Sequence, residues 1–451
     1  MSIRRVLVAN RGEIAVRIVR ACRAVGAESV VAVSAADTDS LAARHANRTV
    51  RIGPATSSDS YLNQDAVLAA ALGTGADAIH PGYGFLAENP EFAEACERNG
   101  LTFVGPSGDT VRTMGNKLAA REVAQRYGVP VVPGSGHITG YQDAVTAAED
   151  VGYPVLVKAA AGGGGRGIRM VSGPDELRST VEHASAEAAA AFGDGTLYLE
   201  RHVATARHIE VQVMADRHGG VVHLGERDCS MQRRFQKIVE EAPASLVPEP
   251  VRTAMRESAV ALTNGIGYEN AGTIEFIYDA DRDEYYFLEM NTRIQVEHPV
   301  TEAITGLDLV AMQLKVASGE PLPVAQDDVT FTGHAIECRI TAESPEHGFR
   351  PAPGHITAWR PPDGCRIDTH CFDGYLVPPF YDSLLAKLVV HGSDRAQATE
   401  RTRQALREFS VTGIDTNLDF LAFLTGHPDF LAGRFSTRWV EHNLDAFSPS
   451  P

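Results

Sequence analysis

The sequence has few lysines, no paired-cysteine pattern and no long apolar run, and each absence excludes a class of protein. Its 451 residues carry 41 basic and 58 acidic side chains, a net charge of −17. So acidic a chain lacks the basic surface that duplex nucleic acid or an anionic membrane requires, although a few local groups can still bind a small anion. No stretch approaches the roughly 18 apolar residues of a membrane span, and no signal-peptide segment follows Met1.

The cysteines and lysines narrow the choice further. The six cysteines show no CxxC or metal-ligand spacing, so we expect a reducing, cytoplasmic location. The five lysines are Lys117, Lys158, Lys237, Lys315 and Lys387. The first three fall within the motifs described below, where a compact ammonium suits a phosphate better than a guanidinium does.

Alternating strand and helix patterns in the first hundred residues predict a mostly parallel sheet of α/β type. Arg5–Ala9 is typical of a buried strand, and Ile14, Ile18, Cys22 and Val25 then share one helical face. The unit recurs with strands at Ser29–Ser34, Ala76–His80 and Leu101–Val104 and a helix start near Asn89–Pro90. The first strand is not followed by GxGxxG, so no dinucleotide site is assigned there.

A smaller unit is expected from Gly128 to about Val203, and a strand-rich region from about residue 204 onward. The smaller unit contains a glycine run, Lys158 to Gly167, between two strand patterns. Glycines let backbone N–H groups close around phosphate oxygens, and Lys158 supplies charge. The GxxxxGK[ST] pattern is missing, and a surface hairpin would show the same glycines.

Two strands, Gly272–Asp279 and Tyr285–Asn291, are predicted to form a hairpin that pairs two carboxylates. Pairing about Arg282 sets Glu275 opposite Glu289 and Thr273 opposite Asn291. The same alternation puts Ile274, Phe276 and Tyr278 with Tyr286, Leu288 and Met290 on the other face. Opposed carboxylates with an amide oxygen suit Mg²⁺ or Mn²⁺, whose coordination shell nucleotide phosphates would complete. The alternative is a solvated pair of glutamates on an exposed hairpin.

Two further segments add charge near this hairpin. Residues 291–298 alternate polar and apolar side chains, which predicts Arg293, Gln295 and Glu297 on one face, as an anionic substrate needs a binder beside a base. Residues 226–237 concentrate positive charge in an acidic protein and favour an anion-binding role. Structural ion pairs are the alternative for both segments.

Several of these segments together resemble biotin carboxylase. The matching motifs are HPGYGFLAEN at 80–89, MGNK at 114–117, KAAAGGGGRG at 158–167, RHIEVQV at 207–213, ERDCSMQRR at 226–234, EMNTRIQVEHPVTE at 289–302, GHAIECRI at 333–340 and PPFYDSLLAKL at 378–388. EMNTRIQVEHPVTE is highly specific, whereas other ATP-grasp enzymes share the glycine loop.

The resemblance implies an ATP-grasp fold of mixed α/β and α+β class. It implies an N-terminal Rossmann-like domain (1–113), an ATP-grasp domain (114–330) with a glycine-loop lid at about 128–203, and a C-terminal α+β domain (331–451). ATP would lie between the lid and the C-terminal sheet.

The resemblance also implies a role for each matching residue. ATP would be contacted by Lys117, Lys158, Gly164, Gly165, Glu200, His208 and Gln232. Mg²⁺ or Mn²⁺ would be held by Glu275, Glu289 and Asn291, and bicarbonate by Lys237, Arg293, Gln295 and Val296. Glu297 would deprotonate bicarbonate, and Arg339 would stabilise the enolate oxygen of biotin.

The implied reaction carboxylates biotin on a separate carrier. Bicarbonate attacks the γ-phosphorus of ATP to give carboxyphosphate, which splits into CO₂ and phosphate; phosphate takes the ureido proton and the biotin nitrogen captures CO₂. Implied partners are a biotin carboxyl carrier protein, a carboxyltransferase of acetyl-CoA type, as in fatty acid biosynthesis, and a second copy in a homodimer. No methionine adjoins a lysine, so we expect no biotin on this chain.

Three departures from the family pattern keep alternatives open. Phe235 replaces a nucleotide-contacting histidine, His202 a usual aromatic residue, and Ala161 a frequent glycine. The alternatives are the biotin carboxylase component of pyruvate carboxylase, another ATP-grasp ligase, and a weakly active regulatory paralogue. The intact set Glu275, Glu289, Asn291, Arg293 and Glu297 argues against the last two.

Overall fold

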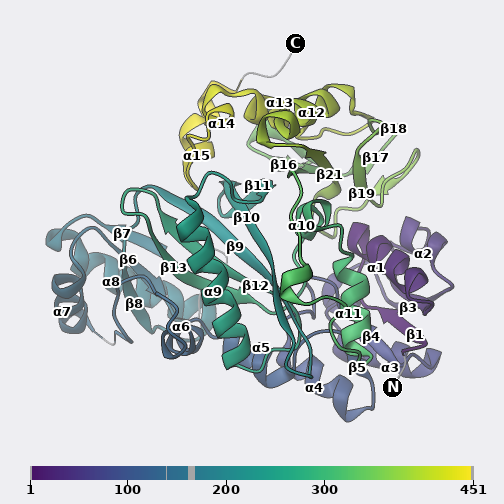
Figure 1. Cartoon of the computed structure of the whole chain (residues 1–451), viewed down its shortest axis with the longest axis horizontal. Helices are drawn as coiled ribbons and strands as arrows, with labels where there is room; N and C mark the ends of the chain where they lie inside the picture. Colours follow the sequence, from purple (N-terminus) through teal and green to yellow (C-terminus); the bar gives the residue numbers. More distant parts are fainter. Residues whose placement is uncertain (1–2, 139, 161–167, 448–451) are drawn as a thin grey trace.

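The computed structural model describes residues 3–138, 140–160 and 168–447. Three sheets dominate it, and Figure 1 shows the chain passing from the N-terminal sheet through the lid region to a long central sheet. Within the described residues, no helix has the length and apolarity to cross a membrane.

The N-terminal sheet is parallel, as predicted, with strand order β3-β2-β1-β4-β5. Its strands are β1 (Arg5–Val8), β2 (Glu28–Ser34), β3 (Arg48–Gly53), β4 (Ala78–His80) and β5 (Thr102–Phe103), and its helices are α1 (Gly12–Ala24), α2 (Leu41–His45), α3 (Gln64–Thr74), α4 (Pro90–Arg98) and α5 (Gly108–Gly115). The predicted start of α4 is confirmed: the Asn89 side chain accepts a hydrogen bond from Phe92 N at 2.7 Å, and Pro90 occupies the first turn.

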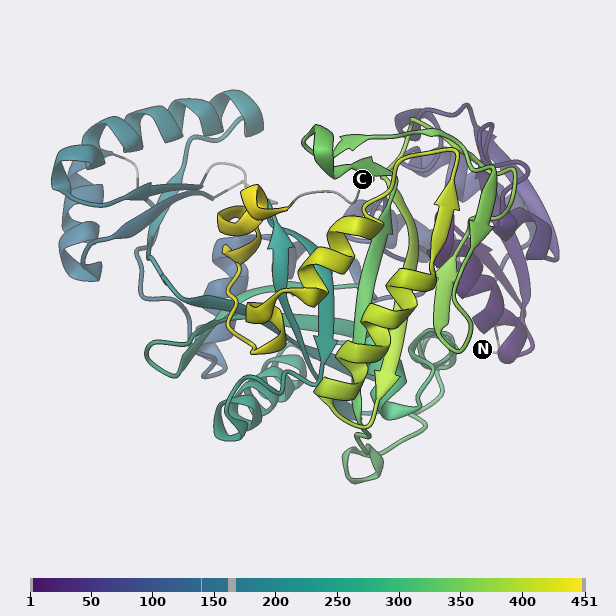
Figure 2. The ribbon, with the colours of Figure 1, turned by 90° about the horizontal axis from the view of Figure 1, so that it is seen from above.

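The lid region projects from one end of the molecule (Figures 1 and 2). It is an antiparallel sheet of order β7-β6-β8 covered by two helices. These elements are β6 (Val155–Ala159), β7 (Ile168–Val171), β8 (Leu197–Arg201), α7 (Tyr141–Val151) and α8 (Pro174–Phe192). The helix α6 (Lys117–Arg126) precedes it and packs against the central sheet.

The central sheet has eight strands in the order β13-β12-β9-β10-β11-β14-β21-β19. They are β9 (Ala206–Ala215), β10 (Val221–Arg233), β11 (Gln236–Ala242), β12 (Asn270–Asp279), β13 (Glu284–Asn291), β14 (His334–Thr341), β19 (Arg366–Thr369) and β21 (Leu384–Gly392). Because β11 pairs with β14, the sheet runs without a break across the predicted boundary at residue 330.

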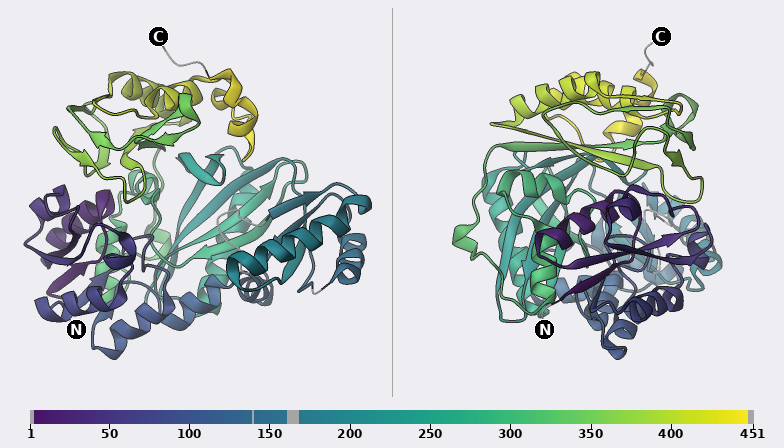
Figure 3. Two further views of the ribbon diagram at one scale, coloured as in Figure 1. Left: turned by 180° about the vertical axis from the view of Figure 1, so that it is seen from behind. Right: turned by 90° about the vertical axis from the view of Figure 1, so that its right-hand side faces the viewer.

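Helices cover this sheet and leave one surface for the site. On the β9–β13 part, α9 (Glu249–Gly265) packs over an apolar face, while α12 (Arg395–Glu408) and α13 (Leu418–Gly426) cover the C-terminal strands (Figure 2). The remaining helices are α10 (His298–Thr305), α11 (Leu309–Ala317), α14 (Pro428–Leu431) and α15 (Trp439–Asn443). Seen from behind, the C-terminal region lies above the N-terminal sheet (Figure 3).

The minor elements are short strands and turns in the C-terminal region and its approaches. They are β15 (Glu343–Ser344), β16 (Arg350–Pro351), β17 (Gly354–His355), β18 (Ala358–Arg360), β20 (Leu376–Val377) and β22 (Ser410–Thr412), with single 3₁₀ turns at Ser57–Asp59, Gln326–Asp328, Pro345–His347 and Leu444–Ala446.

The predicted hairpin exists, but its register is correct for only half its length. Glu275 lies opposite Glu289 and Thr273 opposite Asn291, as expected. Leu288 forms a β-bulge, so Phe276 instead faces Phe287 and Tyr278 faces Tyr285. The expectation that Tyr286 and Leu288 lie on the apolar face is therefore wrong. Leu288 lines the cleft described below, and Tyr286 pairs with Ile277, another residue of that cleft.

Candidate active site

A cleft of about 1280 Å³ lies between the lid region, the central sheet and the C-terminal region. Most of the predicted site residues line it: Lys117, Lys158, Glu200, His208, Gln232, Lys237, Glu275, Glu289, Asn291, Arg293, Gln295, Val296 and Arg339. Glu297 lies beneath its floor, fully buried. Gly164 and Gly165 lie outside the described residues.

Lys237, near the start of β11, forms ion pairs with three carboxylates at the bottom of the cleft. Its Nζ lies 2.6 Å from Glu210, 2.9 Å from Glu275 and 2.6 Å from Glu297, measured to carboxylate oxygens. All three carboxylates are buried, and a buried charge is tolerated only when it is paired. Burial alone would lower the pKa of Lys237, but these carboxylates hold it well above its usual range.

The predicted base, Glu297, sits between two cations. One carboxylate oxygen accepts from Lys237, and the other accepts from Arg339 Nη2 at 2.9 Å. Arg339 is anchored on its other side because its Nε donates to Glu240 at 2.5 Å. Burial would raise the pKa of Glu297, but Lys237 and Arg339 hold it well below the ordinary value. In this arrangement Glu297 is ionised, as a base must be before it accepts a proton.

The two opposed carboxylates of the hairpin differ in their surroundings. Glu275 accepts from Lys237, and His208 Nε2 lies 2.9 Å from its other oxygen. Glu289 is partly exposed to the cleft, and its ion-pair partner among the described residues, Lys117, is 3.8 Å away. Burial, then repulsion from Glu275, raises the pKa of Glu289. The under-compensated Glu289 carboxylate opposite Glu275 fits a divalent cation, whereas the Asn291 amide oxygen accepts a hydrogen bond from Arg293 in this structure.

Arg293 and Gln295 lie beside this pair, but not on a strand as their alternation suggests. β13 ends at Asn291, and the chain continues as an irregular turn into α10. Arg293 donates to Asn291 Oδ1 at 3.0 Å and to Gln295 Oε1 at 3.1 Å, and Gln295 Nε2 donates to Glu275 at 3.0 Å. The turn thus brings together the amide and guanidinium groups that the sequence predicted on one face.

The lid side of the cleft has its own ion pair. Lys158, near the end of β6, pairs with Glu200 on the neighbouring strand β8. Arg121 of α6 donates to the other oxygen of Glu200 at 2.9 Å. The two strands therefore hold an ammonium on the lid wall of the cleft, where it can meet phosphate oxygens.

The basic segment 226–237 folds as β10, a two-residue turn and β11. Arg227 is fully buried and donates to Glu210, Gln212 and Thr301, so it is unavailable to a ligand. Gln232, Arg233 and Arg234 reach the cleft instead. The anion-binding expectation thus narrows from the whole segment to its end near the turn and to Lys237.

Sequence reasoning missed Glu210 and Glu240, which hold Lys237 and Arg339 in place. For Glu210 a signal existed: His208, Glu210 and Gln212 alternate with Ile209, Val211 and Val213, which pack in the apolar core under α9. A polar face at period two in a buried strand indicates a site.

Three family models match segments of this chain that together contain the residues lining the cleft. Residues 2–111 match the family model described as biotin carboxylase, N-terminal domain; 116–325 match carbamoyl-phosphate synthase L chain, ATP binding domain; and 337–442 match biotin carboxylase C-terminal domain.

Full-length relatives agree with these matches. The chain is 50% identical to biotin carboxylase 1 of Bacillus subtilis over 97% of this chain and 98% of that one. It is 48% identical to a pyruvate carboxylase subunit of Methanothermobacter thermautotrophicus, over 97% and 89% of the two chains.

Two solved biotin carboxylase structures are similar to this chain over their full length. A biotin carboxylase–βγ-ATP complex from Campylobacter jejuni superposes with a TM-score of 0.94 at 47% identity, covering 98% of this chain and 99% of that one. The biotin carboxylase domain dimer of Hydrogenobacter thermophilus 2-oxoglutarate carboxylase, in complex with MgADP, ADP and bicarbonate, gives 0.94 at 45% identity over 100% of both chains.

Proposed function

Since the chain belongs to the biotin carboxylase family and is an ATP-dependent ligase, we propose that its cleft joins MgATP, bicarbonate and carrier-borne biotin, with Glu297 as the base. One observation carries this proposal: a fully buried carboxylate held between Lys237 at 2.6 Å and Arg339 at 2.9 Å, next to the opposed pair Glu275 and Glu289. An anion and a divalent cation would complete the charge balance of that arrangement.

The proposed nucleotide contacts follow the walls of the cleft. Lys117 and Lys158 would neutralise phosphate oxygens, and the remaining contacts would come from Gly164, Gly165, Glu200, His208 and Gln232. Mg²⁺ or Mn²⁺ would be held by Glu275, Glu289 and Asn291, and would supply charge neutralisation at the phosphoryl group.

The proposed bicarbonate site explains how Glu297 becomes a better base. Bicarbonate would be bound by Lys237, Arg293, Gln295 and the backbone of Val296. When the anion takes hydrogen bonds from Lys237, Glu297 loses part of the attraction that lowers its pKa. Its proton affinity then rises at the moment when bicarbonate must be deprotonated to attack the γ-phosphorus.

Biotin would enter beside Arg339, whose guanidinium would stabilise the enolate oxygen after carboxyphosphate splits and phosphate removes the ureido proton. We propose that the chain serves an acyl-CoA carboxylase of acetyl-CoA type, in which the carboxyl group finally passes to the acyl-CoA. Its partners would be a separate biotinylated carrier protein, a carboxyltransferase and a second copy of this chain in a homodimer. The similarity to a subunit of pyruvate carboxylase favours pyruvate as the second candidate acceptor. The two candidate acceptors are distinguished by supplying the carboxylated carrier to an acetyl-CoA and a pyruvate carboxyltransferase in turn and measuring which product forms.

The activity is tested by measuring ADP release with and without bicarbonate, free biotin and Mg²⁺. We expect release that requires bicarbonate and Mg²⁺ and is stimulated by biotin. Glu297→Gln should lower the rate by at least about 100-fold because the base is lost, whereas Glu320→Gln, at an exposed position, serves as the matched control. ADP release indifferent to bicarbonate and biotin would contradict the proposal.

A further inference from the structure

A buried lysine outside the cleft joins three parts of the chain that are distant in sequence. Lys387, on β21, is fully buried, and its Nζ lies 3.0 Å from Glu13 Oε1 on α1. The same ammonium donates to the carbonyl oxygen of Val296 at 2.8 Å. Lys387 therefore links the C-terminal region and the N-terminal helix to the turn that carries Glu297.

The bond to Val296 acts on the backbone that orients Glu297. The carbonyl belongs to the peptide unit between Val296 and Glu297, so its direction fixes where the Glu297 side chain leaves the chain. The backbone hydrogen bonds of this turn are long, with His298 N 3.4 Å from Gln295 O and Val300 N 3.3 Å from Glu297 O. The shorter, charge-assisted bond from Lys387 is therefore the firmer constraint on the turn.

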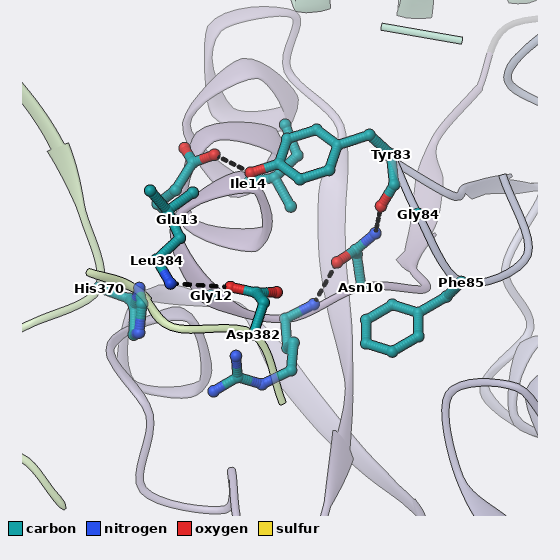
Figure 4. A pocket seen from close by; sticks show the side chains of 11 residues that line it. Asn10, Gly12, Glu13, Ile14, Tyr83, Gly84, Phe85, His370, Asp382 and Leu384 are labelled. Carbon is teal, nitrogen blue, oxygen red and sulfur yellow. Dashed lines mark hydrogen bonds between the residues drawn. The ribbon is translucent and has the colours of Figure 1, made fainter. Parts of the chain in front are cut away.

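The partner carboxylate is itself fixed against the wall of the cleft. Glu13 accepts a hydrogen bond from the hydroxyl of Tyr83 in a small pocket of about 140 Å³ at the start of α1 (Figure 4), and Tyr83 also lines the cleft. The backbone of Tyr83 is held in turn, because its carbonyl accepts from Asn10 Nδ2 at 2.7 Å. A continuous chain of contacts thus runs from the cleft wall through Glu13 and Lys387 to Val296.

Apolar packing does not account for a lysine at this position. Other β21 side chains, such as Leu385, Leu388 and Val390, pack in the C-terminal apolar core. An apolar residue in place of a buried ion pair is often neutral or stabilising. The ammonium of Lys387 faces the buried carboxylates Glu13 and Asp368, and in addition it donates to the Val296 carbonyl, which an apolar side chain could not do.

We propose that Lys387 is a positioning residue that sets the Val296–Glu297 turn for proton abstraction from bicarbonate. The inference rests on the proposed role of Glu297. It predicts that removing the donor lowers kcat while leaving ATP binding intact, because Lys387 does not line the cleft in the described structure.

The test compares two double variants in which the charge of the pair is cancelled. Glu13→Gln with Lys387→Met removes the donor, and Glu13→Gln with Lys387→Gln retains an N–H donor of shorter reach. Against Glu13→Gln alone as reference, we expect kcat for bicarbonate-dependent ADP release to fall about tenfold with methionine and less with glutamine, with the KM for ATP within about twofold.

The outcomes separate this inference from the proposed function. Equal kcat in the two double variants would overturn the role of Lys387, whereas a wild-type chain without bicarbonate-dependent ADP release would overturn the proposed function. If the methionine variant does not fold, Glu13→Gln with Lys387→Leu takes its place, and a kcat equal to that of the glutamine double variant would overturn the proposal.

Discussion

Among single residues, Phe235 departs most visibly from what its surroundings favour. It stands at the tip of the β10–β11 turn with 63% of its surface exposed. Its φ is +64° and that of Arg234 is +49°, values that the two-residue turn requires and that Asn or Gly adopt more easily. The aromatic ring lines the cleft that we assign to ATP, two residues before Lys237.

Replacing this ring tests whether a nucleotide contact is missing. Phe235→His should lower the KM for ATP by up to about tenfold, the value of one hydrogen bond, if an imidazole there reaches the ribose or phosphates. Phe380→His is the matched control, because Phe380 is 52% exposed and does not line the cleft. An unchanged KM in steady-state ADP release would show that the pocket works around the phenyl ring.

The role of a residue could be predicted from sequence where its chemistry and its spacing along the chain agree. It could not be predicted where the role depends on contacts between residues far apart in sequence. Glu275, Glu289 and Asn291 follow from strand alternation and a hairpin register. Lys387 does not, because its partners Glu13 and Val296 are 374 and 91 residues away along the chain. No local pattern distinguishes it from a strand lysine pointing to solvent.

At the scale of elements, the hairpin shows where sequence reasoning ends. Alternation fixed the pairing of Glu275 with Glu289 but could not reveal the extra residue at Leu288, since a bulge changes register without a characteristic sequence. The likewise alternating segment 291–298 is a turn rather than a strand, because its polar groups bond to one another and to Glu275 instead of to a neighbouring strand.

The helix α6 links a cap to the site. Asn116 precedes Lys117, the first residue of α6, and its side chain accepts from Ala119 N at 3.0 Å. Asn116→Ala should reduce the free energy of unfolding by about 1 kcal/mol and raise the KM for ATP severalfold, because Lys117 loses its fixed start. Asn116→Asp keeps the cap and should behave like wild type in urea unfolding and ADP release. Equal behaviour of both variants would refute this link.

At the scale of the whole molecule, one face of the central sheet carries charge through its buried middle. In register across neighbouring strands lie Glu240 opposite Glu337, and Arg339 opposite Lys387, which in turn faces Asp368. The pairing of β11 with β14 continues this sheet across the predicted domain boundary at residue 330. The division of the chain into three domains therefore remains a prediction. The charged face extends from Glu297 into the C-terminal region and joins the two regions electrostatically.

Glu337 is the least compensated member of this face. It is fully buried, and neither carboxylate oxygen has a hydrogen-bond partner among the described residues. Burial raises the pKa of Glu337 well above its usual value; Lys387 opposes this and Glu240 adds to it. Burial likewise raises the pKa of Glu240 to about 7, against the pull of Arg339 and with repulsion from Glu297.

These shifts predict how stability depends on pH. An acid whose folded pKa exceeds its unfolded value binds its proton more tightly in the native state, so its contribution is present below the unfolded pKa and is lost as pH rises toward the folded one. Glu337→Gln removes one such group. We expect its urea-unfolding midpoint to match wild type near pH 5. Near pH 8.5 its midpoint should exceed that of wild type by the equivalent of at least about 1 kcal/mol.

Glu346→Gln, at an exposed position, is the control and should follow the wild-type curve throughout. Parallel wild-type and Glu337→Gln curves from pH 5 to 8.5 would mean that Glu337 is ionised in the fold and that Lys387 compensates it fully.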